Sequence, residues 1–169
     1  GIPTFAYITE AKVKDINAMD KIPYEVGSYY IFDRGYNDYT RLYAIHMIGA
    51  TFIVRAKKNV KYKRISWKRK MQHNVLSDST ICFAGYYQQD DYPELLRLIR
   101  YWDEENKREF LFLTNNFDLS ALEVAELYRN RWQIELFFKW LKQHLKIKHF
   151  YGTSLNAVKI QVYVAIITF

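Results

Sequence analysis

Hydrophobic and polar positions alternate with a helical period along residues 120–148, which predicts a single long helix. Ser120 is a suitable N-cap and Glu123 completes a capping box, with Leu119 and Val124 placed for a hydrophobic staple. At helical spacing the apolar residues share one arc: Leu127, Ile134, Phe137, Phe138, Leu141 and Leu145. Beside this arc runs a polar stripe at intervals of three, four or seven: Tyr128, Arg131, Glu135, Lys139, Lys142 and Lys146.

The first third of the chain predicts strands that alternate with helices. Residues 4–11 alternate like a half-buried strand, and residues 29–32 form a short apolar strand that ends at Asp33-Arg34-Gly35. A helix is expected over residues 37–48 and a further strand over 50–55. This order predicts an α/β fold in which helices pack on a mixed sheet.

The middle of the chain changes character at a basic segment, residues 57–70. Its cations alternate with apolar side chains, which predicts a charged strand or hairpin: Lys57, Lys58, Lys61, Lys63, Arg64, Lys68, Arg69 and Lys70. Residues 71–93 are expected to be loops around short strands, and residues 95–102 and 109–114 to form a hairpin. A last helix is expected over residues 155–169. The basic segment is interpreted as a contact to the DNA backbone, the alternative being a merely soluble edge strand.

Composition narrows the class of protein further. Half of the 169 residues are hydrophobic, so the chain is expected to be globular, and its net charge of +7 favours a polyanionic partner. Cys82 is the single cysteine, which excludes an internal disulfide framework and a cysteine-based zinc site. No apolar run is long enough to cross a membrane, and the single cysteine fits a reducing cytoplasm.

Two acidic residues are candidates for chemistry, and each has an ordinary alternative. Asp33 ends a short apolar strand, where α/β sheets often present functional side chains, but Asp-Arg-Gly is equally an ordinary turn. Glu135 is the one acid in a line of cations. It reads either as a metal ligand or as the centre of a solvated Arg131–Glu135–Lys139 ladder.

The spacing Tyr128-x2-Arg131-x3-Glu135-x6-Lys142, within LYRNRWQIELFFKWLKQHL, resembles the Y-R-E-K signature of one branch of bacterial insertion-sequence DDE transposases. FDRGY resembles the segment that carries the second catalytic aspartate of that family. The resemblance implies an RNase H-like, retroviral-integrase-like fold in one domain. It would consist of a core (1–55), a β-rich insertion (about 56–117) and core helices (118–169).

The same resemblance implies a metal-dependent cleavage and strand transfer of DNA at insertion-sequence ends. Asp33 and Glu135 would bind Mg²⁺ or Mn²⁺, as hard cations prefer oxygen ligands. Tyr128, Arg131 and Lys142 would contact DNA near the cleaved end, with Lys139 and Lys146 as further contacts. The partners implied are the insertion-sequence ends and target DNA, with a homodimer of the longer protein left open and no membrane.

One departure from the family concerns its first catalytic aspartate, which precedes an IPTF-like segment. Here that segment begins at residue 2, and Glu10, Asp15, Asp20 and Glu25 do not match the motif. The chain is therefore expected to be an N-terminally truncated transposase domain with little or no activity alone. The alternatives are a non-catalytic DNA-binding remnant and an RNase H-like nuclease.

Overall fold

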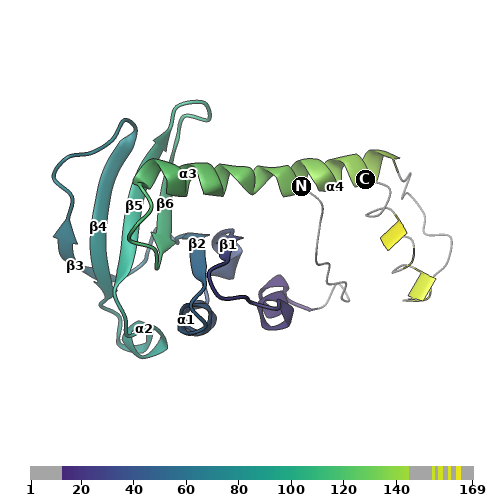
Figure 1. Cartoon of the computed structure of the whole chain (residues 1–169), viewed down its shortest axis with the longest axis horizontal. Coiled ribbons are helices and arrows are strands. Elements are labelled where there is room, and N and C mark those ends of the chain that lie inside the picture. Colours follow the sequence, from purple (N-terminus) through teal and green to yellow (C-terminus); the bar gives the residue numbers. More distant parts are fainter. Residues whose placement is uncertain (1–12, 145–153, 155, 158–159, 161–162, 165–169) are drawn as a thin grey trace. The chain divides into compact units, whose positions relative to one another are not determined.

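The structure is a computed structural model that describes residues 13–144, 154, 156–157, 160 and 163–164 (Figure 1). The predicted strand over residues 4–11 and most of the predicted helix over 155–169 lie outside the described residues. The chain divides into two compact units, one of residues 14–129 and one of residues 1–13 with 130–169, and each is described by itself.

The first unit is built on one six-stranded mixed sheet with the order β1-β2-β6-β5-β4-β3. Neighbouring strands β1 and β2 are parallel, and every other pair is antiparallel. In chain order the strands are β1 (Tyr29–Phe32), β2 (Thr51–Arg55), β3 (Tyr62–Trp67), β4 (Val75–Phe83), β5 (Leu96–Asp103) and β6 (Arg108–Thr114). The predicted strands at 29–32 and 50–55 and the predicted hairpin are therefore confirmed.

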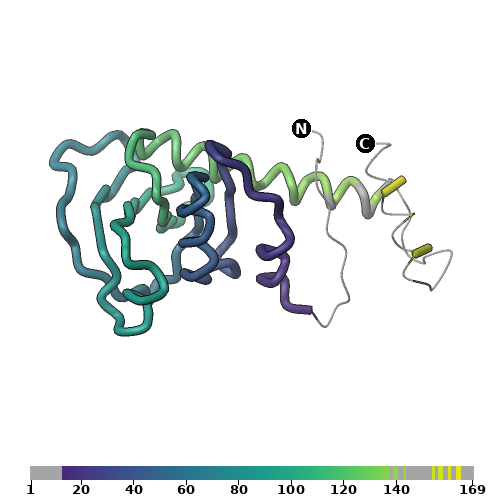
Figure 2. The backbone as a smooth tube through the Cα atoms, turned by 60° about the horizontal axis from the view of Figure 1, so that its bottom comes forward, coloured from purple at the N-terminus to yellow at the C-terminus, as the bar shows by residue number. Residues whose placement is uncertain are grey.

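The helical segments of the first unit lie at both ends of its sequence and between its strands. They are η1 (Asp15–Lys21), η2 (Arg34–Tyr36), α1 (Tyr39–Met47), α2 (Tyr86–Asp91) and α3 (Ala121–Asn130). The predicted helix over 37–48 is confirmed as α1, which lies beside η1 (Figure 2) and is tied to it by the ion pair of Arg41 with Asp20, at 2.7 Å.

Alternation along the strands sorts the core into two layers, because successive side chains point to opposite faces of a sheet. In β2, Phe52 and Val54 pack with Leu42 and Ile45 of α1, whereas Ile53 packs with α3. The same alternation continues in β6. There Leu113 joins the first cluster and Phe112 the second. The sheet thus separates α1 from α3.

Strands β2 and β6 pair over Ile53–Arg55 and Phe112–Thr114. Side-chain hydrogen bonds continue the contact between these strands past the end of this pairing. Thr114 Oγ1 donates to the carbonyl of Phe52 at 2.6 Å. Asn115 accepts from the Phe52 N–H and donates to the Ala50 carbonyl, both at 2.9 Å. These contacts fasten the end of the β5–β6 hairpin to the strand that precedes the basic segment.

The expectation of loops around short strands over residues 71–93 is only partly right, because the nine-residue strand β4 and the helix α2 lie there. The polar run Ser77-Asp78-Ser79-Thr80 conceals β4 in the sequence. Asp78 and Ser79 are nevertheless buried, and the register with β5 shifts between Val75 and Ser77. An irregular register and a buried ion pair break the simple alternation by which a strand is recognised.

The single helix predicted from Ser120 is also wrong, because a turn at Arg131 separates α3 from α4 (Trp132–His144). The Ile134 N–H bonds to the Arg131 carbonyl, three residues back, at 3.1 Å, which is the spacing of a tighter turn. Asn130, a weak helix former, precedes this turn. Residues 145–148 of the predicted helix lie outside the described residues.

The buried face of α3 differs from the predicted arc. It consists of Ala121, Val124, Ala125 and Tyr128. Leu127, which was expected on the arc, is half-buried, and Ile134 in α4 is exposed. Two alanines and a tyrosine give a weak hydrophobic signal, so the sequence pattern placed the face towards the larger aliphatic residues.

Candidate active site

Asp33 stands directly after β1 and caps the short helix η2. Its Oδ1 accepts a hydrogen bond from the Arg34 N–H at 2.7 Å, and its side chain is half-buried. The turn around it is held by the buried Asn37, whose Nδ2 donates to the carbonyls of Arg34 and Arg55 at 2.8 Å each. The ends of the parallel strands β1 and β2 are thereby tied together next to Asp33.

Tyr128 contacts Asp33 across the fold, although 95 residues separate them in sequence. The Tyr128 hydroxyl donates to Asp33 Oδ1 at 3.1 Å. Its ring is 6% exposed and packs on Phe110 and Phe112, with centroids 5.6 and 4.8 Å away. The side chain expected on a polar stripe is therefore buried, with its hydroxyl on the candidate catalytic carboxylate. The sequence pattern did not indicate this contact.

Arg131 and Glu135 form an ion pair within the second unit, with Arg131 Nη2 2.7 Å from Glu135 Oε1. This is the contact that the solvated ladder predicts, and the two side chains are 20% and 41% exposed. Lys139 is exposed. For Lys142 only the backbone in α4 is described, and Lys146 lies outside the described residues.

The structure brings Asp33 together with Tyr128, and Arg131 together with Glu135, each pair within its own unit. Within the described ranges, no group of three or more His, Cys, Asp or Glu side chains could hold a metal ion. Carboxylate oxygens such as those of Asp33 and Glu135 are nonetheless the donors that Mg²⁺ and Mn²⁺ prefer. Over the same described residues, no helix is long and apolar enough to cross a membrane.

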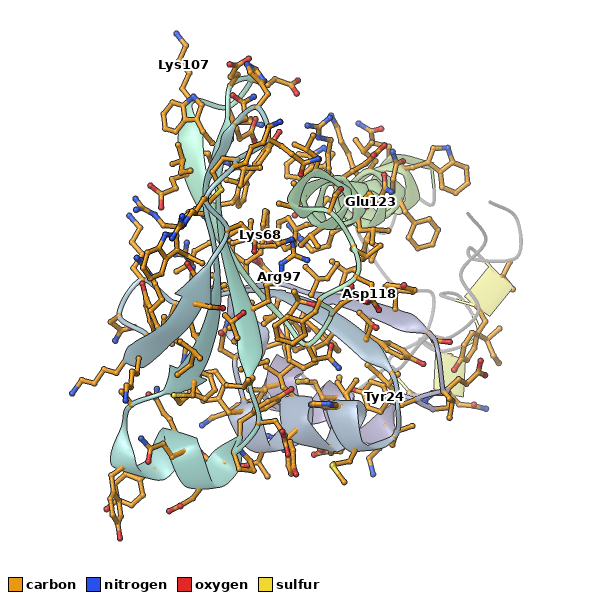
Figure 3. The ribbon with its side chains drawn as sticks, turned by 60° about the vertical axis from the view of Figure 1, so that its left-hand side comes forward. Tyr24, Lys68, Arg97, Lys107, Asp118 and Glu123 are labelled. Atoms are coloured by element: carbon orange, nitrogen blue, oxygen red, sulfur yellow. The ribbon has the colours of Figure 1, made fainter. Side chains whose placement is uncertain are left out.

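The basic segment lies at the edge of the sheet opposite β1. All eight of its cations are exposed. Lys63 and Arg64 belong to the edge strand β3, and the others lie in the flanking turns. Lys68 and Arg97, labelled in Figure 3, meet at Asp78, with Lys68 Nζ 3.1 Å from its carboxylate. A hollow of about 160 Å³ opens here, and it is lined by Ser66, Trp67, Lys68, Asp78, Thr80, Arg97 and Phe117.

Arg97 and Asp78 form a buried two-pronged ion pair that the sequence analysis missed. Arg97 Nε and Nη2 each donate to Asp78 at 2.7 Å, and Arg97 Nη1 donates to the carbonyls of Asn116 and Leu119. Burial by itself raises the pKa of Asp78, but hydrogen bonds from Arg97 and Lys68 outweigh it and hold that pKa below its usual value. Arg97 is a lone cation in the apolar run LLRLI, and that isolation was a usable sign of a buried acidic partner.

Comparison with known proteins places the chain among transposases. A family model described as "Transposase DDE domain" matches residues 1–169. "Putative transposase y4zB" of Sinorhizobium fredii is 36% identical, over 99% of this chain and 48% of that protein. "Probable transposase for insertion sequence element IS5377" of Geobacillus stearothermophilus is 31% identical, over 81% of this chain and 36% of that protein. The chain thus spans about half the length, or less, of these curated relatives.

Proposed function

The chain belongs to the family of transposase DDE domains, and we propose that it supplies Asp33 and Glu135 to metal-dependent cleavage and strand transfer of DNA at insertion-sequence ends. The relatives named as insertion-sequence transposases support the DNA substrate. We also propose that the protein acts at the chromosome in the bacterial cytoplasm, and that the longer protein forms a homodimer.

The observation that carries this proposal is the contact between Tyr128 and Asp33. Asp33 ends β1 and accepts a hydrogen bond from α3, and Glu135 follows Tyr128 by seven residues. The family's chemistry requires carboxylates at one site, and Asp33 and Glu135 are the pair that we propose.

Asp33 and Glu135 would hold the divalent cation, Mg²⁺ or Mn²⁺. Such ions neutralise charge on the attacking and leaving oxygens of a phosphodiester. Asp33 and Glu135 correspond to two of the three carboxylates that the resemblance to the family implies, and we propose that residues 1–169 alone cleave DNA weakly or not at all. Arg131 is proposed to neutralise Glu135 before substrate binds, since their ion pair is present already.

DNA contacts are proposed along the basic segment, which is Lys57, Lys58, Lys61, Lys63, Arg64, Lys68, Arg69 and Lys70. All of these side chains are exposed. Lysine and arginine bind phosphates without reading base sequence, so this surface would hold DNA and leave recognition of the ends to other contacts. Arg131, Lys139, Lys142 and Lys146 are proposed as further phosphate contacts near the cleaved end.

The test is strand cleavage on DNA that carries the element's own ends, with the protein as its gene encodes it and Mg²⁺ or Mn²⁺ present. We expect Asp33→Asn and Glu135→Gln each to lower the cleavage rate by at least about 100-fold, since each removes a charged metal ligand. Asp90→Asn and Glu126→Gln, which change exposed acids in α2 and α3, are the matched controls. Unchanged cleavage in Asp33→Asn or Glu135→Gln would contradict the proposal.

A non-catalytic DNA-binding remnant is the second candidate, and the exposed basic segment favours it. It predicts DNA binding that falls with salt while cleavage is absent from the gene's whole product. The enzyme is favoured over the remnant if wild type cleaves DNA and Asp33→Asn does not, while Asp33→Asn binds DNA with the same affinity as wild type.

A further inference from the structure

The hydroxyl of Tyr128 is the polar end of a side chain that is otherwise enclosed by the core. Its ring belongs to the cluster of Ile53, Phe110, Phe112 and Val124 and is 6% exposed. A buried tyrosine finds a hydrogen-bond partner for its hydroxyl. Here that partner is Asp33 Oδ1, at 3.1 Å. Because packing sets where the ring lies, it also sets where the hydroxyl meets the carboxylate.

Within the described part of the chain, Asp33 Oδ1 accepts hydrogen bonds from at least two donors that lie far apart in sequence. One is the N–H of Arg34, its neighbour, at 2.7 Å, and the other is the hydroxyl of Tyr128 from α3. The Arg34 N–H fixes the carboxylate against its own turn. The Tyr128 hydroxyl comes from α3 and restricts rotation of the carboxylate about the side-chain bonds of Asp33. Hydrogen bonds to a carboxylate also favour its charged form.

We propose that Tyr128 is a positioning residue, which holds the Asp33 carboxylate in a fixed orientation for a divalent cation. This inference rests on the proposed function, in which Asp33 binds the metal. Tyr128 acts through Asp33. Donors to ligating carboxylates are known to tune metal sites, and their loss typically weakens metal binding by about 10- to 100-fold.

The alternative is a tyrosine that serves only the core. Both accounts predict that loss of the ring destabilises the fold, so truncation to alanine cannot separate them. Tyr128→Phe keeps the ring against Phe110 and Phe112 and removes the hydroxyl alone. Tyr101→Phe is the matched control, because Tyr101 packs on the same cluster, with its ring centroid 6.5 Å from that of Phe112.

The experiment uses the whole chain and Mn²⁺ as the probe. Mn²⁺ bound at Asp33 broadens the NMR signal of the Arg34 amide, which donates to that carboxylate. We expect Tyr128→Phe to raise the Mn²⁺ concentration needed for half-maximal broadening by about 10-fold or more. Tyr101→Phe should leave this concentration unchanged.

The outcomes separate this inference from the proposed function. If Asp33→Asn abolishes the broadening and Tyr128→Phe needs the same Mn²⁺ concentration as wild type for half-maximal broadening, the positioning role is overturned and the metal site stands. If wild type shows no broadening, or Asp33→Asn broadens like wild type, the proposed metal site fails and takes the inference with it. Equal losses in Tyr128→Phe and Tyr101→Phe, or an unfolded Tyr128→Phe, would assign the tyrosine to packing and also overturn it.

Discussion

Arg97 and Asp78 each carry a charge in a part of the sheet that water scarcely reaches, with side chains 2% and 5% exposed. Arg100 and Glu109 make the same two-pronged contact on neighbouring strands, at 2.7 and 2.9 Å, but remain 47% and 38% exposed. The two pairs differ in solvation far more than in geometry. Removal of one partner should therefore be costly only where the other is left buried.

We expect Asp78→Asn to lower the free energy of unfolding by about 3–5 kcal/mol at pH 7, because Arg97 loses its counter-charge. Glu109→Gln, the exposed control, should cost less than about 1 kcal/mol. Chemical denaturation of both variants measures the difference. Similar losses in the two would show that burial does not set the strength of the Arg97 pair.

The same pair predicts a pH dependence of stability. The pKa of Asp78 is lower in the folded state than in the unfolded state, where it is about 4. The carboxylate therefore stabilises the fold fully above that unfolded pKa, and this stabilisation is lost as the pH falls through the pKa of the folded state. Wild type should lose stability below about pH 4, and Asp78→Asn should lose less over that range. Denaturation midpoints measured from pH 6 to pH 2.5 check this, and parallel curves would refute it.

Sequence reasoning at this scale found residues whose role is set locally and missed those set by distant partners. Asp33 was found because it ends a short apolar strand, and the capping box was found because Ser120 and Glu123 are three residues apart. Tyr128 was misplaced, because its hydroxyl pairs with a residue 95 positions away. No periodicity within a helix contains that information.

At the scale of elements, α3 begins with reciprocal hydrogen bonds, as predicted. The Ser120 N–H donates to Glu123 at 2.7 Å, and the Glu123 N–H donates to Ser120 Oγ at 3.2 Å. The hydrogen bond from the Ser120 backbone lowers the pKa of Glu123. This start matters for the site because α3 carries Tyr128 in its last turns.

We expect Ser120→Ala to lower the free energy of unfolding by about 1 kcal/mol, because an N–H of the first turn loses its acceptor. Ser120→Asp retains a capping oxygen and should lie within a few tenths of a kcal/mol of wild type. Urea denaturation followed by circular dichroism measures both. A cost shared equally by the two variants would show that the hydroxyl is not acting as a cap.

Elements with a regular pattern were predicted well, namely β1, α1, β2 and the β5–β6 hairpin. The full length of β4 was missed because Asp78 and Ser79 are buried polar residues near an irregular register, and the charged partners of Asp78 come from β5 and the segment after β3. The turn at Arg131 was missed for another reason. The sequence on both sides favours helix, so the interruption is a small local shift in hydrogen bonding.

At the scale of the whole molecule, the net charge of +7 is concentrated in part on the exposed basic segment at residues 57–70. If that segment binds DNA, Lys63→Gln with Arg64→Gln should reduce the dependence of affinity on salt by about 0.9 in slope for each phosphate that the variant no longer neutralises. Lys14→Gln with Lys21→Gln removes the same charge from exposed positions near η1. Binding to duplex DNA over a series of salt concentrations compares the two.

Equal changes in slope for the two double variants would mean that net charge alone governs binding. No change in either would remove the basic segment from the DNA interface. Only a reduction confined to the Lys63 and Arg64 variant supports the proposed surface.

The hydrogen bonds by which Thr114 and Asn115 join the end of β6 to β2 bear on whether residues 56–117 could be exchanged for another segment. Residues 56–117 follow β2, and their last strand, β6, pairs directly with β2. This segment is therefore part of the central sheet and is not a separable insertion. Deletion of residues 56–117 would remove the strand that pairs with β2 and would expose Ile53 to solvent. Replacement of this segment would therefore replace four of the six strands, β3 to β6.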